Sequence, residues 1–208
     1  MFGHIQVHPV NPQPRAISQA VEVLNAGGLI VYPTDSCYAL GCKIGEKEAM
    51  ERMRRVRELD SGHHFALVCR NLSEIAQFAR VDNQQYRLLK SATPGSYTFL
   101  LEATREVPRR LQHPKRSTIG LRIPDHIVAQ ALLARLNEPL LSSSLVLPGE
   151  KLPLLDPDEI VERLRGRVDL VLDSGACGSE MTTVVDLTGP NPALVRRGKG
   201  SLAALGME

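Results

Sequence analysis

Residues 28–42, GLIVYPTDSCYALGC, constrain the fold of this chain more than any other stretch. An apolar run at 29–32 follows a Gly-Gly pair, and a short apolar run between turn signals is typical of a buried strand. The run ends at Pro33, which has no N–H to donate to a sheet. Hydroxyl and carboxylate side chains follow at 34–36, where a strand end often meets a ligand in α/β folds. On this stretch alone, a strand followed by an ordinary polar turn is the favoured interpretation.

The length and composition predict one globular domain over residues 1–208, without a second C-terminal domain. Apolar residues make up 43% of the chain, yet no run approaches the roughly 20 apolar residues of a membrane span. The first fifteen residues lack the pattern of a signal peptide, so we expect a cytoplasmic protein without a membrane partner. No two cysteines form a CxxC pair, which argues against zinc and for reduced thiols, at Cys37, Cys42, Cys69 and Cys177.

Hydrophobic periodicity and turn residues predict that helices and strands alternate irregularly along the chain. A helix begins at Pro14 and stops before Gly27, and the next one covers 46–58. The element order mixes β-α units with consecutive strands, which predicts an α/β sheet of mixed direction and not a regular doubly wound one. The further helices are expected at 72–80, 82–91, 126–137 and 156–165, and the strands at 5–7, 29–32, 65–69, 97–103, 118–124, 139–149, 168–173, 182–187 and 193–197.

The segment YPTDSCYALGC resembles the YPTDT-YGLGC signature of the YrdC/YciO family, the threonylcarbamoyl-AMP synthases and their relatives. Further matches extend from about residue 14 to about 198, and the YciO-type branch is the most similar. The resemblance implies a twisted, open, mixed β-sheet with flanking helices around a positively charged cavity. It also implies an activity: threonine, bicarbonate and ATP give threonylcarbamoyl-AMP and pyrophosphate, for a tRNA adenosine modification. ATP, with Mg²⁺, is then a substrate, and no tightly bound cofactor is expected.

Several motifs match residues that contact threonine in the family. Residues 118–122, TIGLR, resemble the family's T-V-A-V-R strand, whose arginine holds the threonine carboxylate. Residues 142–146, SSSLV, resemble its S-A-N segment, and residues 182–187, TTVVDL, resemble S-T-V-V-D-L. By this match the threonine-binding residues are Thr34, Arg122, Ser142 and Thr182. An arginine beside a sheet edge without any ligand is the alternative for Arg122.

The nucleotide-binding positions include two departures from the family pattern. Arg55 stands where the family's K-x-R motif has lysine, and Arg is a poor replacement for a compact ammonium at a phosphate site. Val146 stands where the S-x-N asparagine is expected, so an amide becomes apolar. The loop at 60–64 is also longer, and its His63 and His64 are candidate phosphate contacts, with simple exposure to solvent as the alternative. The matched nucleotide-binding residues are Arg55, Arg57, Thr118, Ser144 and Arg196, the last from the terminal R-x-G motif.

Two basic clusters, at 52–57 and 109–116, predict a cationic surface despite a net charge of only +2. Such a surface suits the phosphate backbone of RNA. Aromatic residues, which stack on unpaired bases, make up only 4% of the chain, so double-stranded or structured RNA is favoured over single strands. A solvated helix face, balanced by nearby glutamates, is the alternative. The candidate RNA-binding residues are Arg52, Arg54, Arg109, Arg110, Lys115 and Arg116.

The sequence therefore leaves several functions open. The first is a nucleotidyltransferase that resembles threonylcarbamoyl-AMP synthase but is slow, because two motif residues differ. The second is a double-stranded RNA-binding protein that uses the cationic cavity without synthesis. The third is a hydrolase of a threonylcarbamoyl adenylate or of a modified tRNA.

Overall fold

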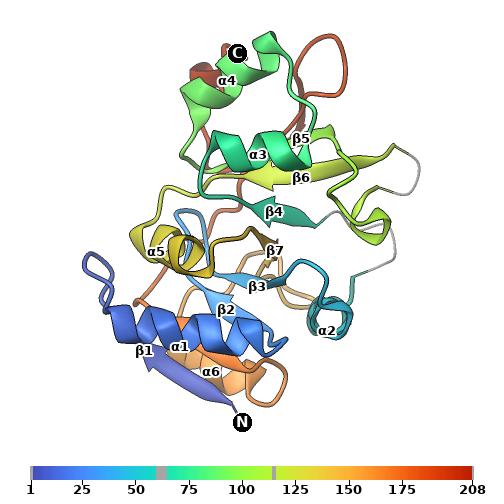
Figure 1. Ribbon diagram of the computed structural model, residues 1–208. Coiled ribbons are helices and arrows are strands. Elements are labelled where there is room, and N and C mark those ends of the chain that lie inside the picture. The colour runs from blue at the N-terminus through green and yellow to red at the C-terminus, as the bar shows by residue number, and fades with distance from the viewer. Residues whose placement is uncertain (1, 60–64, 114–115, 208) are drawn as a thin grey trace.

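The computed structural model describes residues 2–59, 65–113 and 116–207, so His63, His64 and Lys115 lie outside the described residues. Over this part of the chain, one ten-stranded mixed sheet carries six α-helices (Figure 1). The predicted single-domain mixed α/β sheet is thus confirmed. The strands are β1 (Gly3–Gln6), β2 (Ile30–Tyr32), β3 (Ala39–Lys43), β4 (Ala66–Val68), β5 (Tyr97–Glu102), β6 (Thr118–Arg122), β7 (Leu140–Ser144), β8 (Leu170–Asp173), β9 (Thr183–Asp186) and β10 (Ala193–Arg196).

The sheet order is β1-β8-β2-β3-β7-β4-β6-β5-β9-β10. Parallel pairs join β8 to β1 and β2, β4 to β6, and β5 to β9, whereas the other neighbours are antiparallel. One strand, β3, was missed by the sequence analysis. Most of β3 lies inside the YPTDSCYALGC signature. Its sequence, ALGCK, has no distinct apolar run of its own, so no strand was predicted there.

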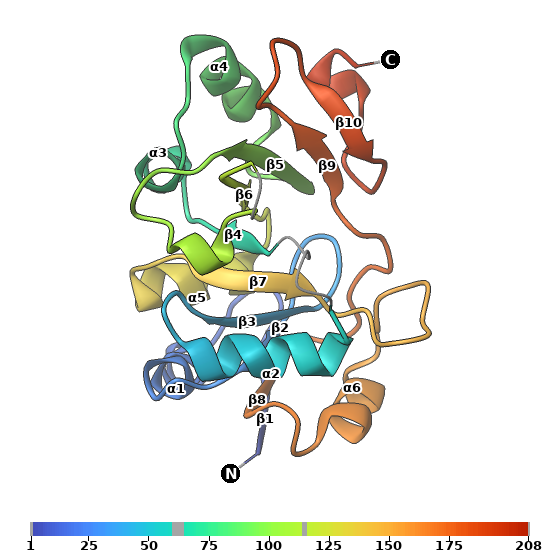
Figure 2. The same ribbon diagram turned by 90° about the vertical axis from the view of Figure 1, so that its right-hand side faces the viewer.

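Two helices cover one face of the sheet and four cover the other. α1 (Pro14–Asn25) and α5 (Ile127–Leu136) bury their apolar sides against β2, β7 and β8. The opposite core contains α2 (Lys47–Arg57), α3 (Leu72–Phe78), α4 (Asn83–Ala92) and α6 (Pro157–Leu164). Figure 2 shows α2 running alongside β3. None of the helices in the described ranges has the length and apolar character needed to cross a bilayer.

The helix boundaries follow the expected chemistry of helix ends. α3 is capped by Asn71, whose side chain accepts from the Glu74 N–H at 3.0 Å. α4 begins with a capping box in which Asp82 and Gln85 satisfy each other's backbone N–H groups. α6 begins at Pro157 after the Asp156 cap. These local rules explain why the predicted helices agree with the structure to within a few residues.

The polar loop between β2 and β3 is buried, unlike an ordinary exposed turn. Thr34 is 3% exposed and Ser36 is fully buried. Tyr38 anchors the end of the loop, because its hydroxyl donates to the Gly175 carbonyl at 2.7 Å. Burial raises the pKa of the Tyr38 phenol, so this hydroxyl stays a donor. The loop is therefore held between the sheet and the segment that follows β8.

Candidate functional site

A cavity of about 650 Å³ lies over the part of the sheet formed by β7, β4, β6, β5, β9 and β10. It extends to Arg57, the last residue of α2. Its walls carry many hydroxyl groups, three arginines and one carboxylate among the described lining residues. The lining residues are Arg57, Phe65, Ala66, Thr98, Leu100, Arg116, Thr118, Gly120, Ser142, Ser143, Ser144, Met181, Thr182, Val184, Asp186, Val195 and Arg196.

The floor of this cavity is one row of residues that the strand register places side by side. Leu100 pairs with Gly120 across β5 and β6, Gly120 with Ala66, and Ala66 with Ser142. On the other side of β5, Leu100 pairs with Asp186. The residues in the middle of the row are therefore apolar, and the residues at its two ends, Asp186 and Ser142, are polar.

Gly120 keeps the middle of the floor flat. A Cβ atom there would lie 3.2 Å from Thr98 Cγ2 and 3.3 Å from the Phe65 carbonyl oxygen, closer than most side-chain contacts. The family motif has alanine at the matching position, so the floor of the cavity lacks one methyl group in this chain.

Arg57 and Arg196 form the cationic end of the cavity. The Arg57 guanidinium donates to the Val146 carbonyl at 3.0 Å and to the Ser143 hydroxyl, and Arg196 donates to the Thr182 carbonyl at 3.0 Å. All of these acceptors are neutral. Within the described ranges, no carboxylate lies within ion-pair distance of either guanidinium.

Burial without an anionic partner is costly for a cation, and the pKa values of both arginines reflect this cost. Burial, as the largest cause, and the nearby Arg196 charge together lower the pKa of Arg57 to about 10. Burial also lowers the pKa of Arg196. An anionic ligand between the two guanidinium groups would relieve both penalties, so this end of the cavity favours phosphate or carboxylate.

The structure brings most of the predicted substrate residues to this one cavity. Those that line it are Arg57, Thr118, Ser142, Ser144, Thr182 and Arg196. Two of them belong to hydroxyl pairs: Ser142 Oγ lies 2.8 Å from the Tyr32 hydroxyl, and Thr182 Oγ1 lies 2.9 Å from Thr98 Oγ1. The grouping comes from three strands, one helix and Thr182, the residue just before β9.

Thr34 and Arg122 lie in a buried cluster beside the cavity and do not line it. Arg122 Nη2 donates to Thr34 Oγ1 at 3.2 Å and forms an ion pair with Asp35 Oδ1. Ser96 Oγ donates to the second Asp35 oxygen at 2.6 Å, and the Lys199 ammonium donates to the Asp35 carbonyl. The carboxylate that Arg122 holds in this structure is thus the protein's own. Arg122 Nε is buried without a hydrogen-bond partner in the described chain.

The structure does not bring Arg55 to the cavity. Arg55 is exposed and lines a separate depression of about 270 Å³ together with Arg52 and Arg167. The Arg167 guanidinium donates to the Val56 carbonyl at 3.0 Å, so it caps the end of α2. Val146, the other departure, reaches the site through its carbonyl, which holds Arg57.

Several predicted RNA-binding arginines have partners within the protein. Arg52 forms a bidentate ion pair with Asp169, at 2.7 and 3.0 Å. Arg54 lies over the Phe65 ring at 4.8 Å, and Arg116 lies 3.6 Å from an Asp186 oxygen. Arg110 donates to the Gly45 carbonyl at 2.8 Å and Arg109 is exposed.

Some cavity residues were not predicted as substrate contacts. Thr98 and Asp186 lie in segments that were predicted as strands, but the strand pattern assigned neither residue a role in binding. Ser143 belongs to a run of three serines. Its contact with Arg57 could not be predicted, because Arg57 lies on α2, 86 positions away in the sequence. Lys199, which donates to the Asp35 carbonyl in the neighbouring cluster, has no local sequence signal.

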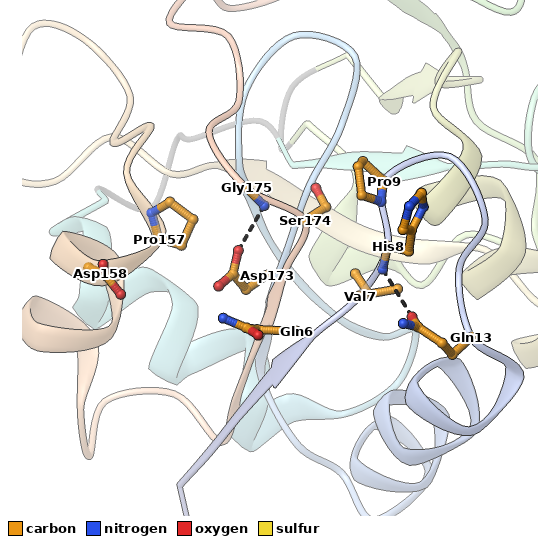
Figure 3. Close-up of a pocket in the computed structure, with 10 residues that line it drawn as sticks. All are labelled: Gln6, Val7, His8, Pro9, Gln13, Pro157, Asp158, Asp173, Ser174 and Gly175. Atoms are coloured by element: carbon orange, nitrogen blue, oxygen red, sulfur yellow. Dashed lines mark hydrogen bonds between the residues drawn. The ribbon is translucent and has the colours of Figure 1, made fainter.

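A second cavity, of about 510 Å³, lies at the carboxyl ends of β1 and β8 (Figure 3). Asp173 and Gln6 lie on one wall, and His8 with Pro9 on the opposite wall. Its charged lining groups, Asp158 and Asp173, are acidic, and it contains none of the predicted site residues. It therefore lacks the cationic character that an anionic substrate requires.

Comparison with known proteins identifies relatives over nearly the whole chain. The Sua5/YciO/YrdC family model, described as "Telomere recombination", matches residues 22–198. The YciO protein of Escherichia coli K12 is 55% identical over 202 residues, which cover 97% of this chain and 98% of that protein. A protein of Haemophilus influenzae is 56% identical over 204 residues, which cover 98% of this chain and 99% of that protein.

Solved structures share the fold. The crystal structure of E. coli YciO superimposes with a TM-score of 0.95 at 53% identity, covering 99% of this chain and 100% of that one. Sua5 from P. abyssi, in a complex with L-threonine, gives a TM-score of 0.86 at 24% identity. The match covers 94% of this chain and 57% of Sua5, so this likeness concerns the fold of part of a longer protein.

Proposed function

The chain belongs to the Sua5/YciO/YrdC family, and we propose that it binds ATP in the cavity over β5, β6 and β9 and slowly forms threonylcarbamoyl-AMP. The observation that carries this proposal is the pair of half-buried arginines, Arg57 and Arg196, whose hydrogen-bond acceptors within the described ranges are neutral. A triphosphate supplies the anion that these two guanidinium groups lack, and arginine suits bidentate phosphate binding. The Mg²⁺ ion that accompanies ATP arrives with the substrate.

The chemistry joins three substrates in two steps. The threonine amine condenses with bicarbonate to a carbamate with loss of water, and a carbamate oxygen then attacks the α-phosphorus of ATP. The bond from the α-phosphorus to the bridging oxygen breaks, and pyrophosphate leaves with the electron pair. Negative charge gathers on the phosphates during this step, so preorganised donors such as Arg57 and Arg196 lower the barrier. The threonine-bound structure of a Sua5 with the same fold supports threonine as the amino acid.

The rate is expected to be low because two donors of the family pattern are missing from the cavity. Arg55, the replacement for the lysine, lies at a different depression, and Val146 has no polar side chain. Loss of one preorganised donor typically costs on the order of 100- to 1000-fold in rate. Threonine-dependent pyrophosphate release, measured with ATP and bicarbonate, tests the proposal.

We predict that Val146→Asn raises the rate of threonine-dependent pyrophosphate release by at least about 10-fold. The new amide restores a hydrogen-bond donor, although it recovers only part of the effect of a fully preorganised one. The Val146 carbonyl that holds Arg57 is a backbone group and is retained in the variant. Leu152→Asn, which adds an amide at an exposed apolar residue, is the matched control. An efficient natural chain, or a folded Val146→Asn variant with no gain, would contradict the slow-synthase proposal.

RNA binding is a second candidate, because exposed arginines of both basic clusters lie along α2. Arg110 contacts Gly45, two residues before α2, so the turn at 109–111 lies beside the start of the helix whose last turn carries Arg55. Exposed Arg109 and Arg110 near the start of the helix, with exposed Arg55 near its end, offer a surface suited to a phosphate backbone. This surface lies outside the ATP cavity, so RNA binding and synthesis are compatible.

We predict that the double variant Arg109→Ala/Arg110→Ala flattens the salt dependence of binding to an RNA duplex by about one unit of slope for each lost phosphate contact. Affinity should fall equally for duplexes of unrelated sequence, because backbone contacts carry no sequence information. The control is Arg163→Ala, since Arg163 is neutralised by Glu150 and Glu159. An unchanged slope in the double variant would show that this surface is only a solvated face.

A further inference from the structure

We infer that the second cavity, at the carboxyl ends of β1 and β8, binds a free basic α-amino acid, arginine or lysine. The inference does not depend on the proposed function, because the described lining residues of this cavity include none of those over β5, β6 and β9. Its volume of about 510 Å³ lies in the range of small-molecule sites.

The sheet places this cavity where two connections diverge. β8 is parallel to both of its neighbours, β1 and β2, at this edge of the sheet. The chain that leaves β1 turns to α1 on one face. The chain that leaves β8 passes the start of α6 on the other face, where the Cys177 N–H donates to the Leu155 carbonyl at 3.2 Å. In open α/β sheets, ligands bind in the crevice at such a switch point.

One wall of the cavity offers two carboxylates, and Figure 3 shows Asp158 and Asp173 on this side together with Gln6. Asp173 is held in place, because its Oδ1 accepts from the Gly175 N–H at 2.8 Å and its Oδ2 pairs with His4 Nε2 at 2.9 Å. Asp158 is exposed and belongs to none of the ion pairs within the described ranges. The described lining contains no lysine or arginine, so this wall suits two cationic groups.

The opposite wall offers two hydrogen-bond donors, from His8 and Gln13 (Figure 3). His8 Nδ1 accepts from the N–H groups of Val10 at 3.2 Å and of Asn11 at 3.0 Å. A neutral ring that accepts at Nδ1 carries its proton on Nε2, so the Nε2–H is the group left to donate. Gln13 Oε1 accepts from the His8 backbone N–H at 2.9 Å, which leaves the Gln13 amide NH₂ as the second donor.

The two walls together match a ligand with two cationic groups and one carboxylate. The α-ammonium and the side-chain cation of a basic amino acid pair with Asp173 and Asp158, and its carboxylate accepts from His8 and Gln13. A neutral amino acid would leave one of the two lining carboxylates without a partner. An acidic amino acid would add a like charge beside them. The donors and acceptors of this cavity therefore select a basic amino acid.

The experiment is isothermal titration of the full chain with L-arginine and with two of its analogues. Citrulline keeps the carboxylate but has a neutral side chain, and agmatine keeps the guanidinium but lacks the carboxylate. We expect arginine to bind at least about 10-fold more tightly than either analogue, because each analogue lacks one charge-assisted contact. L-Lysine should also bind more tightly than citrulline.

Two substitutions of exposed side chains test the two walls separately. Asp158→Asn should weaken arginine binding by about 10- to 100-fold, because it removes a hydrogen bond between charged groups. Gln13→Glu keeps the acceptor for the His8 N–H but replaces the amide donor with a carboxylate. It should weaken arginine binding by at least about 10-fold, whereas agmatine, which has no carboxylate to repel, should bind at least as tightly as before.

Glu106→Gln is the matched control, because it neutralises an exposed carboxylate that lines neither cavity. It should change arginine affinity by less than about twofold, since distant surface charges are screened. ATP binding should be unchanged in Asp158→Asn and Gln13→Glu, and a natural chain that binds arginine but not ATP would end only the proposed function.

Three results would overturn the inference. The first is a natural chain that binds neither arginine nor lysine. The second is equal affinity for arginine and citrulline, or unaltered arginine binding by a folded Asp158→Asn variant. The third is agmatine binding as tight as that of arginine, because the site would then recognise an amine and not an amino acid.

Discussion

Arg57→Ala is expected to bind ATP and inorganic tripolyphosphate about 10- to 100-fold more weakly than the natural chain, because a charge-assisted hydrogen bond to phosphate contributes about 1.5–3 kcal/mol. Arg57 is the last residue of α2, and its guanidinium is already oriented by Val146 and Ser143. Little side-chain entropy is therefore lost when phosphate binds. Isothermal titration of both ligands measures the effect.

Arg55→Ala provides the matched control for this variant. Arg55 comes from the same helix and carries the same charge, but it is exposed at a different depression. Its removal should change affinity for either ligand by less than about twofold, since surface charges act weakly at physiological salt. If Arg55→Ala weakens binding as much as Arg57→Ala, the nucleotide does not occupy the cavity proposed above.

Arg122→Ala is expected to lose about 3–5 kcal/mol of unfolding free energy, because it leaves Asp35 as a buried charge without its partner. Side-chain exposures of 7% for Arg122 and 9% for Asp35 place this pair well inside the protein. On the family resemblance alone, the same variant should keep its fold and lose only threonine binding. The ion pair changes that expectation, since Arg122 stabilises the loop that carries Thr34.

Urea denaturation measures this loss, and two further variants identify its origin. Arg52→Ala removes a more exposed ion pair, the bidentate one with Asp169, in which the side chains are 24% and 30% exposed. This variant should cost only about 1 kcal/mol. The double variant Arg122→Met/Asp35→Leu replaces both charges and should recover much of the stability. An Arg122→Ala protein as stable as the natural chain would show that Asp35 is hydrated and that Arg122 is available to a substrate carboxylate.

The secondary structure was largely predictable because it depends on local signals. Pro14, Asn71 and Asp156 mark helix starts by chemistry that neighbouring residues determine. Strand β3 was missed for the opposite reason: its pairing with β2 and β7 makes it a strand, and its own sequence lacks an independent pattern. The motifs also predicted part of the cavity lining, since Thr118, Ser142 and Thr182 lie on neighbouring parts of one sheet.

The sequence by itself determined that this chain forms a mixed α/β sheet and carries the signature residues of its family. Only the tertiary structure decided which of those residues share a site. Arg55 and Arg57 are two positions apart on one helix, about 200° around its axis, so they point in different directions. The packing of α2 against the sheet then selects Arg57 for the cavity and leaves Arg55 in solvent. The partner of Arg122 was equally undetermined, because the ion pair with Asp35 joins residues 87 positions apart that meet only when the sheet has formed.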